Sequence, residues 1–302
     1  MSTMMSDQST AQVLEDLRPK RSWRQARSNI MVMLMGLAAL VIVVPLVFVI
    51  GSVISRGAGV VFRDFPSFFT KKIPIKSEDI GPGMGPAIVG TMLITGFATL
   101  VAVPLGILGA VYLHEYGGTT KLSKLIRFLA TVMTGVPSIV MGLFIYVIFT
   151  LRFGLSGVGG ALALACLMLP VVIRATEEML RLVPGNLREA SYALGTSKSR
   201  TILTVVLPSA LPGIVSGCLL AVARAAGETA PLLFTIGAAR AVQGNIFKGA
   251  NTALPAQIFE NAKSLFPGAQ ERGWGAALTL VGIAFLFTLT ARIVSSAYQK
   301  RR

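Results

Sequence analysis

Histidine and cysteine are almost absent from this sequence, which contains one histidine and two cysteines. Cys166 and Cys218 both lie inside apolar runs, and neither belongs to a CxxC or CxH pair that would bind a metal. His114 has no cysteine or second histidine near it. The sequence therefore predicts no metal, no disulfide and no cofactor. It also argues against a membrane enzyme, whose site would need clustered His, Asp or Glu.

Charged residues are scarce as well. They make up 14% of the 302 residues, whereas about a quarter is usual for soluble domains. Hydrophobic residues make up 53%, and the mean hydropathy is +0.71. This composition indicates an integral membrane protein in a lipid bilayer. The net charge of +15 comes from short basic blocks between apolar runs, a pattern typical of cytoplasmic loops, so no nucleic-acid partner is expected.

Six apolar stretches are long enough to cross a membrane. Each should be helical, because lipid offers the backbone no hydrogen-bond partners and a barrel would show alternating hydrophobicity. The sequence thus predicts an all-α integral membrane protein with six transmembrane helices, at residues 30–55, 86–113, 128–151, 153–173, 201–239 and 273–291.

The distribution of basic residues predicts the orientation in the membrane. Six spans place both termini on one side. With the N-terminus inside, 17 of the 28 Lys and Arg residues fall in inside segments and 10 in outside loops, which favours cytoplasmic N- and C-termini. The expected segments are an N-terminal tail, a first transmembrane helix, an outer loop that can carry short interfacial helices, a five-span core and a C-terminal tail, at residues 1–29, 30–55, 56–85, 86–297 and 298–302.

The polar segment before the fifth span predicts an elbow of two short helices. Asn186 and Glu189 have the spacing of a capping box, so a helix should begin at Asn186. Gly195 is a typical residue just beyond a helix C-terminus. Thr196 or Ser197 can cap the second helix.

This elbow resembles the EAA loop of type I ABC importer permeases, in which Glu-Ala-Ala, three residues, Gly and nine further residues precede Ile-x-Leu-Pro. Ser191 replaces the third-position alanine and Val205 the isoleucine, whereas the matching residues are Glu189, Ala190, Gly195, Leu207 and Pro208. The resemblance implies a type I permease fold and a coupling helix, at about residues 186–208, that docks on a cytoplasmic ATPase dimer. The sequence has no GxxxxGK[ST] loop, so ATP is expected to be bound and hydrolysed by that separate subunit. The alternative is that Glu189 only caps a helix and Gly195 only ends it.

The stretch AVARAAGETAPLLF (221–234) places an arginine inside the fifth span. An arginine at the centre of a membrane helix costs about 2.5–3.5 kcal/mol on insertion scales. Arg224 and Glu228 are spaced to pair on one helix face, so one interpretation is a salt bridge that only stabilises packing. The other is that Arg224, Glu228 and Thr229 lie on a path for an anion, because guanidinium binds phosphate-like oxyanions bidentately.

Two prolines inside apolar spans predict interruptions of the helices. Pro137 lies in the third span and Pro231 in the fifth. Proline removes a helical hydrogen bond and commonly kinks a membrane helix.

The segment RAAGETAPLLFTIG resembles the fifth span of phosphate-specific ABC importer permeases, and ETAPLLF is similar to their A-type rather than C-type subunit. Three further blocks, GPAIVGT, LGILGAVYLHEYG and TGVPSIVMGLF, also resemble segments of these permeases. The resemblance implies inorganic phosphate as substrate and a bacterial cytoplasmic membrane location. Its implied partners are a homologous C-type permease subunit, an ATPase dimer and an extracytoplasmic phosphate-binding protein. Hydropathy and spacing alone leave open a permease for sulfate, molybdate or phosphonate, or an ion-coupled secondary transporter.

Overall fold

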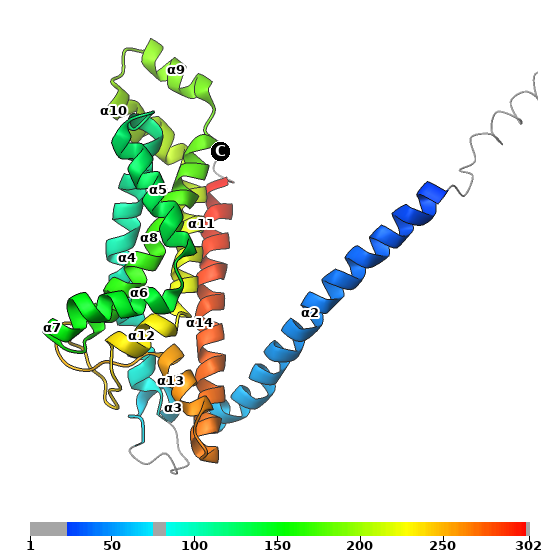
Figure 1. Ribbon diagram of the computed structural model, residues 1–302, viewed down its shortest axis with the longest axis vertical. Coiled ribbons are helices and arrows are strands. Elements are labelled where there is room, and N and C mark those ends of the chain that lie inside the picture. Colours follow the sequence, from blue (N-terminus) through cyan, green and yellow to red (C-terminus); the bar gives the residue numbers. More distant parts are fainter. Residues whose placement is uncertain (1–22, 75–82, 300–302) are drawn as a thin grey trace, which may run out of the picture. The chain divides into compact units, whose positions relative to one another are not determined.

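The computed structural model describes residues 23–74 and 83–299 (Figure 1). Over these residues the regular elements are helices, without strands, as predicted. Residues 1–22 and 300–302 of the predicted tails lie outside the described residues. The chain divides into two units, Met1–Ser52 and Val53–Arg302.

Helix α2 (Trp23–Arg63) contains the first predicted span and is longer than that span at both ends. It starts in the first unit and ends in the second. Residues 56–63 were expected in the outer loop, but they are helical. The physical reason is that Val60 and Val61 are buried in the core of the second unit, which extends the helix.

Five helices among the described residues are long and apolar enough to cross a membrane, and the number becomes six if one bent pair counts as a span. The predicted count of six therefore depends on that pair. The other four besides α2 are α4 (Gly85–Val111), continued by the π-helical turn η1 (Tyr112–Tyr116), then α8 (Gly157–Arg181), α11 (Leu207–Ala226) and α14 (Pro267–Gln299).

The bent pair corresponds to the third predicted span. Helix α5 (Lys121–Gly135) stops before Pro137, and the chain turns by 108° into α6 (Ser138–Ile145). Val136 is extended with ψ 126°, the conformation that a following proline favours. The π-helical turn η2 (Tyr146–Thr150) and α7 (Leu151–Phe153) complete this segment.

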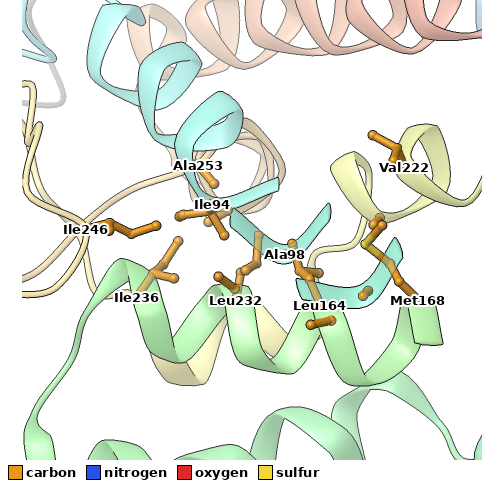
Figure 2. Close-up of a cluster of buried hydrophobic side chains, with 14 residues drawn as sticks. Ile94, Ala98, Leu164, Met168, Val222, Leu232, Ile236, Ile246 and Ala253 are labelled. Carbon is orange, nitrogen blue, oxygen red and sulfur yellow. The ribbon is translucent and has the colours of Figure 1, made fainter. Parts of the chain in front are cut away.

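Helix α8 lies between α4 and α11 at the centre of the second unit (Figure 1). Small residues let these helices approach closely, since a Cβ on Gly106 of α4 would lie 2.6 Å from Val172 Cγ1 of α8. Figure 2 shows the largest buried cluster, which includes Ile94, Ala98, Leu164, Met168, Val222, Leu232 and Ile236. This core ties the end of α11 to α8, and so holds the arginine-bearing turn on a rigid support.

Short helices precede α4 and α14, and the first of them lies in the predicted outer loop at residues 56–85. Helix α3 (Ser67–Thr70) precedes α4, and α13 (Leu254–Ala262) precedes α14. The backbone amide of Leu254 donates to Thr91 Oγ1 of α4 at 2.8 Å, which fixes the start of α13 on the bundle.

Candidate functional site

The fifth predicted span is interrupted beside its arginine. Helix α11 ends at Ala226, and the short helix α12 (Ala230–Thr235) follows after three residues. Pro231 lies in the first turn of α12, where its missing N–H costs no helical hydrogen bond. Thr229 occupies the N-cap position and is half-buried, but its side chain makes no capping bond. An interruption of this span was predicted at Pro231, and the structure places it at residues 227–229, directly before the proline; the span therefore does not continue as one helix to about Ala239.

Arg224 and Glu228 form a loose pair at this break. Arg224 Nε lies 3.8 Å from Glu228 Oε1, which is longer than a hydrogen bond. The Arg224 side chain is 74% exposed on this single chain, and that of Glu228 is 23% exposed. Most guanidinium donors therefore remain available to another group. An arginine at membrane depth needs a water-filled cavity or a partner. The exposed face of Arg224 is therefore expected to line such a cavity or to contact a partner.

The broken third span packs against the broken fifth span. Helices α6 and α12 lie side by side across the bundle (Figure 1). A Cβ on Gly142 of α6 would lie 2.6 Å from Pro231 Cα, so the two backbones are in contact. Pro137 is the N-cap residue of α6. Both proline-marked interruptions thus belong to one packed pair of short helices.

Replacing Gly142 with alanine is expected to destabilise this pair. The added methyl group would meet the Pro231 backbone, which cannot move aside as a flexible side chain can. Overpacking of this kind costs about 1–3 kcal/mol, and we expect a lower thermal midpoint of the detergent-solubilised protein. Gly96→Ala on α4 is the matched control, because nothing lies within 4 Å of its added Cβ. Equal midpoints for the two variants would contradict this packing.

The predicted elbow consists of α9 (Gly185–Ala193) and α10 (Lys198–Thr201), followed by the π-helical turn η3 (Ile202–Val206). Gly195 has φ +77°, which is the left-handed conformation expected just beyond a helix end. The amide of Gly195 donates to Tyr192 O at 2.9 Å, and that of Thr196 donates to Ser191 O at 3.3 Å. These two bonds are those of a Schellman motif, so the glycine sets the bend of the elbow.

The predicted capping box at Asn186 and Glu189 is not present. Helix α9 begins at Gly185 with Pro184 as its N-cap, and no side chain caps it. Pro184 has φ −58° and ψ 140°, a non-helical conformation that already ends the preceding turn. Asn186 therefore lies inside the first turn, and Glu189 is exposed.

Ser191, the departure from the EAA pattern, lies in a buried hydroxyl cluster. Its Oγ is 2.6 Å from Thr196 Oγ1 and 2.9 Å from Thr201 Oγ1. Thr196 Oγ1 also donates to Ser191 O at 2.6 Å. Ser197 occupies the N-cap position of α10 without a side-chain capping bond. The hydroxyl cluster joins the two short helices across the glycine and so stabilises the bend between them.

Arg188 fastens the elbow to the rest of the chain. Its guanidinium donates to Val183 O at 2.8 Å and Leu180 O at 3.1 Å, and it pairs with Glu115 Oε1 at 3.0 Å. Glu115 lies on η1, and its side chain is only 7% exposed. This link between the elbow and the end of the second span was not predicted, because the two residues are 73 positions apart.

The elbow presents an apolar surface. Ala190 and Pro208 are exposed, and Leu207 at the start of α11 is half-buried. Large apolar side chains are also exposed here, namely Leu182, Leu187, Tyr192 and Leu194. An exposed apolar patch on a compact, internally bonded elbow is the kind of surface that a protein partner covers.

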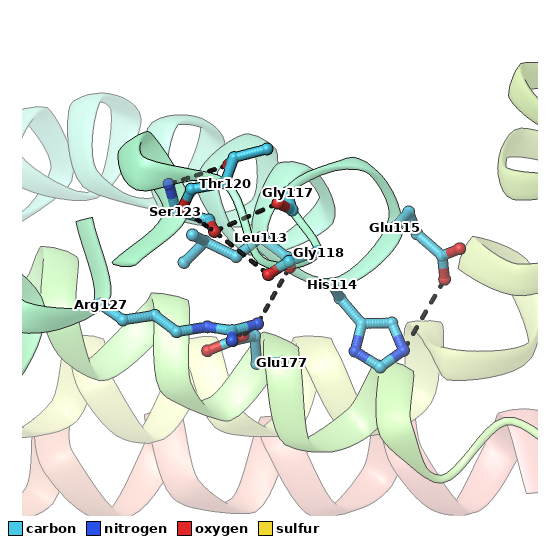
Figure 3. A network of polar contacts seen from close by, with 9 residues as sticks. All are labelled: Leu113, His114, Glu115, Gly117, Gly118, Thr120, Ser123, Arg127 and Glu177. Carbon is cyan, nitrogen blue, oxygen red and sulfur yellow. Dashed lines mark hydrogen bonds and ion pairs between the residues drawn. The ribbon is translucent and has the colours of Figure 1, made fainter. Parts of the chain in front are cut away.

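A second unpredicted polar network holds the turn between α4 and α5 (Figure 3). Ser123 Oγ contacts the carbonyl oxygens of Gly117, Gly118 and Thr120 at 3.0–3.2 Å. Arg127 donates to Leu113 O at 3.0 Å and pairs with Glu177 of α8 at 2.9 Å. The only signal in the sequence is that both charged residues lie close to the ends of apolar runs, Arg127 just before Phe128 and Glu177 shortly after Ile173.

Comparison with known families supports this description. The family described as "Binding-protein-dependent transport system inner membrane component" matches residues 102–302. The chain is 40% identical over 307 residues to "Phosphate transport system permease protein PstA 1" of Mycobacterium tuberculosis, covering 100% of this chain and 99% of the relative. It is 37% identical over 285 residues to "Phosphate transport system permease protein PstA" of Yersinia pestis, covering 94% and 95%.

Solved ABC transporters share the fold. A bacterial ABC transporter involved in the import of the acidic polysaccharide alginate superposes with a TM-score of 0.60 at 15% identity, covering 92% of this chain and 99% of that one. The inward-facing MetNI methionine ABC transporter superposes with a TM-score of 0.55 at 20% identity, and the match covers 70% of this chain and 93% of that one. At these identities the likeness shows the fold alone.

Proposed function

Since this chain belongs to the family of binding-protein-dependent transport system inner membrane components, we propose that it imports inorganic phosphate as one permease subunit of an ATP-driven transporter. It is a multi-pass inner-membrane protein that works with other ABC subunits, and ATP hydrolysis lies on a separate subunit. Relatives named as phosphate permeases over the full length of the chain carry the assignment of the substrate.

The helix break around Arg224 is the proposed substrate path. The guanidinium of Arg224 is exposed in the last turn of α11, and the half-buried carboxylate of Glu228 lies in the non-helical break that follows. This arrangement suits an oxyanion that must bind and then be released. Glu228 holds the guanidinium loosely and competes with the anion for it. Thr229 adds a hydroxyl at the N-cap of α12.

The elbow is the proposed docking site for the ATPase dimer, with both termini in the cytoplasm. Its support is the pattern of Glu189, Ala190, Gly195, Leu207 and Pro208 at fixed spacing, together with the exposed apolar side chains of α9. The further proposed partners are a homologous C-type permease, which would face the Arg224 side, and an extracytoplasmic phosphate-binding protein. Movement of the elbows on ATP binding would then open and close the break to each side in turn.

Uptake in cells tests this proposal. A strain that lacks this chain but keeps the partner subunits is expected to lose high-affinity uptake of radiolabelled phosphate, while sulfate uptake stays normal. Expression of the chain from a plasmid should restore phosphate uptake. Restored uptake of sulfate or molybdate in place of phosphate would overturn the assigned substrate.

A further inference from the structure

A polar pocket of about 260 Å³ lies between α5 and α8, at the end of α8 that leads into the elbow. It is separate from the break at Arg224 and plays no part in the function proposed above. Its polar lining consists of Arg127, Thr131, Arg174, Glu177, Glu178 and Arg181. This size suits a small ion or head group with some water rather than a larger ligand.

The three arginines of the pocket differ in how many hydrogen bonds and ion pairs their guanidinium groups make within the chain. Arg127 pairs with Glu177 at 2.9 Å and donates to a backbone carbonyl (Figure 3). Arg174 makes one hydrogen bond, at 3.1 Å, to the neutral hydroxyl of Thr131. Arg181 makes no hydrogen bond or ion pair to any residue that the structure describes. Two guanidinium groups therefore face the pocket with donors to spare.

The charges of the pocket favour an anion. Three arginines face two glutamates, and the charge of Glu177 is already offset by Arg127. Glu178 is the one remaining carboxylate, and it opposes an anion. Guanidinium groups bind phosphoryl oxygens through paired, charge-assisted hydrogen bonds, and they shed water more readily than an ammonium group does.

We propose that Arg174 and Arg181, supported by Arg127, bind a phosphoryl group in this pocket. That the pocket opens on the cytoplasmic side rests on the proposed function, because the elbow next to Arg181 is the proposed ATPase side. Two sources share this chemistry: inorganic phosphate that has left the transport path, and the head group of an anionic phospholipid of the inner leaflet. Either ligand would tie α5 to α8 directly beside the elbow.

The test measures binding of inorganic phosphate to the complete complex, with both permeases and the ATPase dimer but without the binding protein. All variants carry Arg224→Ala, so that the transport path of this chain does not contribute. The complex is placed in nanodiscs of phosphatidylcholine alone, and radiolabelled phosphate is measured by equilibrium dialysis. A parallel set uses equal parts of phosphatidylcholine and phosphatidylglycerol, with retained lipid identified by native mass spectrometry.

Arg174→Gln is expected to weaken phosphate binding about tenfold, as loss of one charge-assisted pair would. Glu178→Gln is expected to tighten it severalfold, because it removes the opposing carboxylate. Lys124→Gln on α5 removes a charge outside the pocket and should change nothing. A merely structural role of Arg174 would not give opposite effects for these arginine and glutamate variants.

The two sources give different results. Phosphate binding in both kinds of nanodisc identifies free phosphate. Retention of phosphatidylglycerol by the parent complex and its loss in Arg174→Gln identify the lipid. If neither ligand responds to Arg174→Gln and Glu178→Gln, the proposed site is wrong. Phosphate uptake by the complex without these substitutions, measured in parallel, separates this failure from a failure of the proposed transport function.

Discussion

Arg224→Ala is expected to abolish phosphate uptake while the subunits still assemble. The variant removes the basic side chain at the break of the fifth span, where it is 74% exposed and only loosely held by Glu228. Loss of one preorganised donor to an oxyanion typically costs a factor of about 10²–10³. We therefore expect the uptake rate to fall by about a hundredfold or more, with normal co-purification of the partner subunits.

Arg224→Lys and the double variant Arg224→Ala, Glu228→Ala separate charge from structure. Lysine keeps the charge but lacks the planar guanidinium group that binds an oxyanion through two parallel hydrogen bonds. Arg224→Lys should therefore keep only a small part of the uptake. If the pair serves only to stabilise the helix, removing both charges should restore stability and uptake together. Because the two groups are 3.8 Å apart, we expect little stability to be lost in any of these variants. Normal uptake by Arg224→Ala would contradict the substrate path.

Gly195→Val is expected to uncouple ATP hydrolysis from transport. Gly195 has φ +77°, and a β-branched residue in that conformation costs about 1–3 kcal/mol. The space around it is open, so the effect comes from the backbone and not from a clash. The bend that positions α9 should therefore change. We expect a several-fold drop in phosphate transported per ATP hydrolysed, or weaker co-purification of the ATPase.

Gly195→Asn is the control for this substitution. Asparagine tolerates the left-handed conformation better than other residues with a Cβ, so it should keep most of the coupling. Full coupling in Gly195→Val, or equal losses in both variants, would count against docking through this elbow.

Local chemistry explains why some features of the fold could be predicted from the sequence. Hydropathy marked the apolar helices because a bilayer demands long uncharged stretches. Gly195 was predicted as a helix stop because few residues other than glycine adopt its conformation. The start of α9 was predicted one residue late, because Pro184 caps the helix by its own backbone geometry instead of the favoured Asn186.

The remaining features depend on contacts between distant residues. The pairs Arg188–Glu115 and Arg127–Glu177 join residues 73 and 50 positions apart, which no local spacing reveals. The close packing of α6 against the Pro231 backbone, directly after the break at residues 227–229, likewise joins residues far apart in the sequence. Exposure of Arg224 was likewise not readable from the sequence, since a buried salt bridge would have the same i, i+4 spacing.

Reconstituted uptake tests the central claim most directly. The two permeases and the ATPase dimer are placed in proteoliposomes with the phosphate-binding protein on the outside and ATP within. We expect radiolabelled phosphate to accumulate only with ATP and the ATPase subunit, and excess unlabelled sulfate should not reduce the rate. Accumulation without the ATPase, or competition by sulfate equal to that of unlabelled phosphate, would contradict the account of this chain as a subunit of an ATP-driven phosphate importer.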